Sequence, residues 1–219
     1  MLSRVGRLQV VEIDREIIPV LKKQFADHQG FTVHQADALK FDYSRLKTDA
    51  QNLRLIGNLP YNISTPLLFH LISFNHIISD MLFMLQKEVV DRLVAQVGTK
   101  EYGRLSVMVA CRCQVTRAFN IKPGAFMPPP KVDSSIVHIQ PYRDPPIQVG
   151  DAAHFEKIVR FAFGKRRKTL RNALKEIISE KDFDEAEINQ MLRPEQLSIE
   201  QFGRLSITSY KANQNTDRI

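Results

Sequence analysis

Short apolar runs and stretches of helical spacing alternate along the first half of the chain. Four runs have the apolar and β-branched composition of strands, at residues 8–14, 31–35, 53–57 and 81–85. Three other segments place apolar side chains three or four positions apart, at residues 15–26, 65–74 and 87–97. This alternation predicts an α/β fold with a Rossmann-like, doubly wound parallel sheet.

Three further segments extend this pattern. Thr65 and Pro66 have the residue types of a helix start, an N-cap followed by proline at the first helical position. The run Arg104–Cys111 fits either a helix or a strand, and we favour the helix. Strands at residues 114–121 and 134–140 are expected to complete the sheet.

Prolines and a glycine interrupt the pattern near residues 141–150 and indicate a domain boundary. The residues beyond it show helical spacing, at 152–163, 166–179, 184–192 and 198–212. We therefore expect an α/β domain over residues 1–145 and a small all-α domain over residues 146–219.

The composition adds a basic character to this picture. The 219 residues include 31 Lys+Arg and 24 Asp+Glu, a net charge of +7, which favours a polyanionic partner. Cys111 and Cys113 are too close for a disulfide framework and lack companions for a zinc site, so we expect reduced thiols, no metal and a cytoplasmic location. No apolar run reaches the roughly 18 residues of a membrane span, and the segment Met1–Arg4 does not resemble a signal peptide.

The segment Gly57–Asn62 carries the most specific chemistry. It follows an apolar strand and presents the Asn58 carboxamide, the rigid Pro60 and the aromatic Tyr61. Open α/β sheets bind their ligands at the carboxyl ends of their strands, where this segment is expected. A carboxamide beside an aromatic ring on a stiff turn suits a planar base that carries an amino group.

One acid lies at the end of the first predicted strand and another just after the second. In nucleotide-binding sheets an acid at the position of Glu12 binds ribose hydroxyls, and Asp37 is placed to accept from an adenine amino group. Together with Asn58, the two acids are predicted to converge on one crevice, which would form a half-site for an adenosyl cofactor. The alternative for each acid is a solvated position on the surface. No Gly-x-Gly occurs and only eleven residues precede Glu12, so we expect the first strand and its glycine-rich loop to lie outside this chain.

Seven segments spread over essentially the whole chain carry a recognisable pattern: Val11–Asp14, Gln35–Ala38, Gly57–Pro66, Met84–Val90, Tyr102–Val107, Phe126–Ser134 and Arg166–Asn172. In these segments and in their order, the chain resembles the bacterial adenine dimethyltransferases of small-subunit (16S) ribosomal RNA.

The resemblance implies S-adenosylmethionine as cofactor, with two methyl groups transferred to each of two adjacent adenosines near the 3′ end of the RNA. It places Glu12 at the cofactor ribose, Asp37 at its adenine and Asn58 between cofactor and target amine. The family's amino-terminal segment has no counterpart here. We therefore expect a truncated reading frame or a fragment with impaired cofactor binding, acting as a monomer.

The same residues suggest a mechanism. The Asn58 oxygen and a main-chain carbonyl of Leu59 or Pro60 would accept from the target amino group, while Tyr61 stacks on the extruded base. Phe126, on a loop stiffened by Pro128, Pro129 and Pro130, is the expected second face of the stack. The alternative for each ring is a place in the core, where Met81 and Met84 are also expected.

A run of basic residues is the candidate RNA contact. Between Lys157 and Lys175 there are eight Lys or Arg and no acid. The predicted RNA-binding residues are Lys165, Arg166, Arg167, Lys168, Arg171 and Lys175. Three of them, at 168, 171 and 175, are expected on one helical face that binds phosphates; the alternative is a solvated basic face.

Other functions remain open. A DNA amino-methyltransferase usually has proline at the second position of the motif, where this chain has Leu59. The large-subunit RNA methylases of macrolide resistance share the asparagine–proline–tyrosine core, although the segments Pro128–Ser134 and Arg166–Asn172 fit the small-subunit enzymes better. A non-catalytic RNA-binding or ribosome-assembly factor is the alternative from another class.

Overall fold

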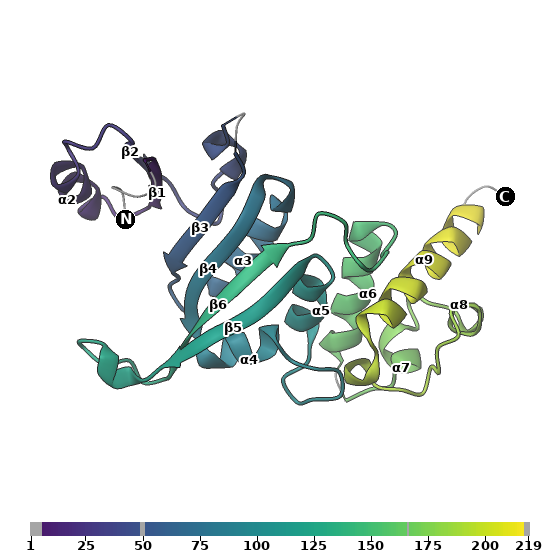
Figure 1. Cartoon of the computed structure of the whole chain (residues 1–219). Helices are drawn as coiled ribbons and strands as arrows, with labels where there is room; N and C mark the ends of the chain where they lie inside the picture. Colours follow the sequence, from purple (N-terminus) through teal and green to yellow (C-terminus); the bar gives the residue numbers. More distant parts are fainter. Residues whose placement is uncertain (1–5, 49–50, 166, 217–219) are drawn as a thin grey trace.

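The computed structural model describes residues 6–48, 51–165 and 167–216, and within them the strands form two separate sheets (Figure 1). The smaller sheet consists of β1 (Leu8–Glu12) and β2 (Phe31–Gln35), which pair in parallel. Helix α2 (Ile17–Gln24) connects them, as a parallel pair requires. The carboxyl ends of both strands therefore lie side by side.

The larger sheet has the strand order β3-β4-β6-β5. Strands β3 (Leu53–Asn58) and β4 (Ile78–Gln86) are parallel, with α3 (Ser64–Ile72) as their crossover. Strand β6 (Ser134–Pro141) pairs antiparallel with β4 and with β5 (Cys113–Ile121). Asn58 pairs with Met84 in this register, so the candidate motif leaves the sheet beside the end of β4.

Helices cover one face of the larger sheet. Helices α3, α4 (Lys87–Leu93) and α5 (Arg104–Ala110) share a buried cluster with Met81 and Leu85 of β4 (Figure 1). On the other face, the paired Ile56 and Leu82 are 49% and 44% exposed.

The carboxyl-terminal helices form a second core. They are α6 (Ala152–Gly164), α7 (Leu170–Leu174), α8 (Glu180–Glu185) and α9 (Ile199–Thr216). Tyr102 and Val107, from the segment before α5 and from α5 itself, are buried in this same cluster. The two cores thus meet at α5. The expected domain boundary between residues 145 and 146 stays a prediction.

Most predicted elements are confirmed within a few residues, including the helix at Arg104–Cys111. The helix start at Thr65 is wrong: α3 begins at Ser64, with Ile63 as N-cap and without a side-chain cap. The backbone turns earlier because Ile63 N already donates to Pro60 O at 3.1 Å. The sheet is also split and partly antiparallel, rather than continuous and parallel.

Two predicted helices of the second domain are wrong as well. The segment 166–179 is helical only over α7, because Ser179 begins a new helix through a reciprocal capping box with Asp182. The segment 184–192 is not a helix. Glu187, whose φ is +56°, ends α8 in the left-handed region, and Ile188 N then donates to Phe183 O at 2.9 Å.

No helix within the described residues is long and apolar enough to cross a membrane.

Candidate active site

The motif residues form a tight turn between β3 and α3. Leu59 is buried, and its N–H donates to Met84 O at 3.2 Å, which continues the β3–β4 pairing by one residue. Pro60 O accepts from Ile63 N, so this carbonyl is already used within the turn. In the described part of the chain no donor is found for Leu59 O, which leaves it as the better candidate acceptor for a ligand.

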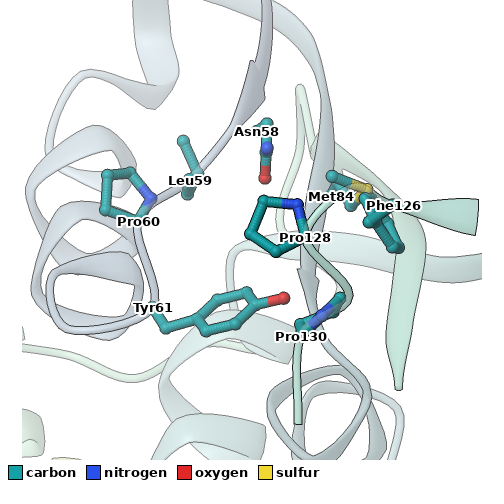
Figure 2. A pocket seen from close by; sticks show the side chains of 8 residues that line it. All are labelled: Asn58, Leu59, Pro60, Tyr61, Met84, Phe126, Pro128 and Pro130. Atoms are coloured by element: carbon teal, nitrogen blue, oxygen red, sulfur yellow. The ribbon is translucent and has the colours of Figure 1, made fainter. Parts of the chain in front are cut away.

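This turn forms one wall of a pocket of about 310 Å³ (Figure 2). The proline-rich loop after β5 and the end of β4 supply the rest. The lining residues are Asn58, Leu59, Pro60, Tyr61, Met84, Phe126, Pro128 and Pro130. Its size is at the lower end of the range for ligand pockets, about 300–1,000 Å³, which suits a single planar base.

The walls of the pocket are uncharged and largely apolar. The Asn58 carboxamide enters it from above in Figure 2, with the Tyr61 ring below and Phe126 to the side. No hydrogen bond to the Asn58 side chain is found within the described residues, and this side chain is exposed. Its amide is therefore available to a ligand, and an uncharged base fits the pocket better than a phosphate does.

The structure brings together the five residues predicted for the chemical step. Tyr61 is 37% exposed and Phe126 is half-buried, so neither ring is part of a closed core. Met84 was expected in the core and lines the pocket instead, whereas Met81 is fully buried. The available signal for Met84 was its place near the carboxyl end of a predicted strand, since open α/β sheets bind their ligands at that edge.

The two predicted cofactor carboxylates lie apart from this pocket. Glu12 is the last residue of β1 and Asp37 lies two residues beyond the end of β2, and Ala36 N donates to Glu12 O at 3.0 Å. One oxygen of Glu12 accepts from Ile13 N and Asp14 N, at 2.8 and 2.9 Å, and one oxygen of Asp37 accepts from Leu39 N at 2.9 Å. These bonds orient both carboxylates and leave their second oxygens for a ligand. The predicted convergence with Asn58 stays a prediction.

The basic run is less uniform than its sequence indicates. Lys165 pairs with Glu176 at 3.7 Å, and Arg171 pairs with Glu180 at 2.5 Å. Both acids lie just beyond the acid-free run. Helix α7 spans only 170–174, so the expectation of residues 168, 171 and 175 on one helical face is wrong.

Other members of the run lie on the surface. Lys168 and Arg167 are exposed, and Lys175 lies with Lys157 at a cavity of about 430 Å³. Arg166 lies outside the described residues. The RNA contact of this basic run stays a prediction.

Neither metal nor thiol chemistry is evident in the described part of the chain. No group of three or more His, Cys, Asp or Glu side chains there could hold a metal ion. Burial raises the pKa of the Cys111 thiol to about 11 and that of Cys113 to about 12, so both are protonated and poorly nucleophilic at neutral pH.

Comparison with known proteins decides the family. The model of the family "Ribosomal RNA adenine dimethylase" matches residues 1–211. The chain belongs to this family. Among curated relatives, this dimethylase is 52% identical over 206 residues to the ribosomal RNA small subunit methyltransferase A of Pseudomonas aeruginosa, covering 94% of the chain and 77% of the relative. The same-named protein of Saccharophagus degradans is 53% identical over 201 residues, with 92% and 75% covered.

Solved structures agree with this assignment. A dimethyladenosine transferase from Plasmodium falciparum has a TM-score of 0.79 and 25% identity, covering 94% of this dimethylase and 83% of that chain. The 23S rRNA methyltransferase ErmE has a TM-score of 0.65 at 21% identity, with the same coverage, and shows the fold alone. The dimethylase is therefore an S-adenosylmethionine-dependent methyltransferase with a Rossmann-like fold.

Proposed function

We propose that this dimethylase transfers methyl groups from S-adenosylmethionine to the 6-amino groups of two adjacent adenosines near the 3′ end of 16S ribosomal RNA. The observation that carries the proposal is the Asn58 carboxamide, which has no hydrogen-bond partner among the described residues and enters an uncharged, base-sized pocket lined by two aromatic rings. Family membership and the names of the relatives support the small-subunit substrate.

The acids at the carboxyl end of β1 and just beyond β2 fit the cofactor. Glu12 and Asp37 each keep a carboxylate oxygen without a hydrogen bond among the described residues, suited to ribose hydroxyls and to an adenine amino group. Bound S-adenosylmethionine supplies an electrophilic methyl group at its sulfonium. Asn58, which ends β3, is the residue proposed to lie between cofactor and target.

The two rings hold the extruded base. Removing an adenine from its RNA stack costs a few kcal/mol. Stacking on Tyr61 is worth about 1–3 kcal/mol, and Phe126 from the opposing loop contributes a second contact. Together the two contacts offset the cost of extrusion, so the base is held in the pocket long enough to react.

The polar groups orient the amine. Its lone pair is delocalised into the ring, which makes it a poor nucleophile. The Asn58 oxygen and Leu59 O would accept its two N–H groups and favour a pyramidal nitrogen facing the methyl donor; Pro60 O is less suited because Ile63 N occupies it. No acid, histidine or lysine lines the pocket, so the proton released after transfer passes to water and catalysis comes from positioning.

The partner is ribosomal RNA, and its phosphates are proposed to contact Lys157, Lys168 and Lys175. We also propose that the dimethylase works as a monomer, in the cytoplasm and without a metal ion. The absence of charge from the pocket is consistent with chemistry that needs no metal.

A transfer assay tests the function. Small subunits lacking this modification are incubated with the protein and labelled cofactor, and the label is mapped to the RNA. The proposal expects incorporation at two neighbouring adenosines in 16S RNA. Label in 23S RNA instead would support a large-subunit methylase.

A non-catalytic ribosome-binding role is the second candidate. The observation in its favour is that the two-stranded sheet with Glu12 and Asp37 at its carboxyl edge is not hydrogen-bonded to β3 within the described residues. The acids proposed to bind the cofactor are therefore not fixed by strand pairing to the sheet that carries Asn58. This role predicts tight binding to small subunits without incorporation of label.

A further inference from the structure

Tyr61 lies on a partly exposed turn, yet hydrogen bonds hold both its side-chain hydroxyl and its main chain. Its hydroxyl oxygen is 3.2 Å from Ser134 Oγ, and its main-chain carbonyl accepts from Ser64 Oγ at 3.2 Å. The two serines come from different elements, since Ser64 begins α3 and Ser134 begins β6. The ring is therefore tied to both the motif turn and the sheet.

Both serines are rigid supports. Ser134 is 0% exposed and Ser64 is 1% exposed. Ser134 is also fixed by strand pairing on two sides, opposite Gln86 of β4 and opposite Ile121 of β5. A hydroxyl held in this way can fix the far end of the tyrosine ring.

The proline-rich loop that carries Phe126 runs from the end of β5 to Ser134, the first residue of β6. The bond between Tyr61 and Ser134 thus joins the two walls of the pocket. A base stacked between two rings needs walls about 7 Å apart, twice the roughly 3.4 Å spacing of stacked bases. A fixed spacing avoids the entropic cost of ordering a mobile ring on binding.

We propose that Ser134, assisted by Ser64, is a positioning residue that holds the Tyr61 ring at the distance and angle required to stack on the target base. This inference rests on the proposed function. It assigns no chemistry to the serine, which acts through the tyrosine.

The chain offers a matched control for Ser134. Its neighbour Ser135, the second residue of β6, is also 0% exposed, but its hydroxyl donates to Asn120 instead of reaching the motif. A merely structural effect of removing a buried hydroxyl should appear equally in Ser134→Ala and Ser135→Ala.

The test is a double-mutant cycle with Tyr61→Phe, Ser134→Ala and the combined variant, together with Ser135→Ala. Tyr61→Phe keeps the ring and removes only the hydroxyl at a partly exposed site, so it should not impair folding. We expect kcat/KM on unmodified small subunits to fall about tenfold in each single variant, the upper end for loss of one neutral hydrogen bond. The combined variant should be no worse than either single variant, and Ser135→Ala should stay within about twofold of the wild type. Additive losses, or equal losses in Ser134→Ala and Ser135→Ala, would overturn the proposal.

A second readout does not depend on methyl transfer. A 16S RNA fragment with 2-aminopurine at the first target position reports extrusion and stacking of the base by its fluorescence. Ser134→Ala and Tyr61→Phe should change the protein-induced signal equally, whereas Ser135→Ala should leave it unchanged; a signal that is the same in all variants overturns the inference. If the wild type transfers no methyl group, the proposed function fails, and this fluorescence cycle still decides the role of Ser134.

Discussion

Replacement of Asn58 by alanine should separate activity from stability. The Asn58 side chain is exposed and makes no hydrogen bond within the described residues. Its removal should therefore change the free energy of unfolding by no more than about 0.5 kcal/mol. If its oxygen orients the target amine, the variant loses a preorganised contact in the transition state, and losses of this kind lower kcat about 10²–10³-fold, or roughly 2.7–4 kcal/mol.

The assay measures initial rates of methyl transfer to unmodified small subunits at saturating cofactor, with thermal unfolding in parallel. Asn52→Ala is the matched control, because Asn52 is also exposed but precedes β3 at the opposite end of the strand. We expect Asn52→Ala to retain the wild-type rate and both variants to retain the wild-type Tm. The reasoning is refuted if Asn58→Ala keeps its kcat, or if its loss of activity accompanies an equal loss of stability.

Three further outcomes are expected. Glu12→Ala should weaken cofactor binding about tenfold or more in calorimetric titrations, the scale of a hydrogen bond to a charged group, while RNA affinity stays constant; unchanged cofactor affinity would contradict the role of this carboxylate. Lys175→Ala should reduce the magnitude of the slope of log RNA affinity against log salt concentration by about one. Lys165→Ala should reduce it less, because Lys165 already pairs with Glu176. Equal slopes for the wild type and Lys175→Ala would exclude this phosphate contact. Both cysteines should resist a thiol reagent at pH 8 until the protein unfolds, because burial raises the pKa values of the two thiols to about 11 and about 12; rapid labelling of the native protein would show that they are accessible.

Local patterns in the sequence determined the elements and the motif. The apolar run that leads into Gly57 and Asn58 was predictable as a strand, because its period and its residue types are local properties of the sequence. The motif follows directly, so its place at the carboxyl end of β3 was predictable. The acids after β1 and β2 were located in the same way.

Helix boundaries in the second domain were less predictable. The spacing of 166–179 continues across Ser179, but the reciprocal bonds between Ser179 and Asp182 begin a separate helix there. The ion pairs to Glu176 and Glu180 likewise come from residues beyond the basic run. These contacts depend on how the short helices of this domain fold against one another, which residue spacing alone does not specify.

Only the tertiary structure decided how the predicted residues are held together and which others join them in the pocket. The antiparallel pairing of β5 with β6 brings Phe126 and its prolines opposite the motif, and the register of β3 with β4 places Met84 beside Asn58. The bond from Tyr61 to Ser134 joins residues that no local period relates. Secondary structure follows from short-range periodicity, whereas a binding site depends on strand order and register, which are fixed when the whole core packs.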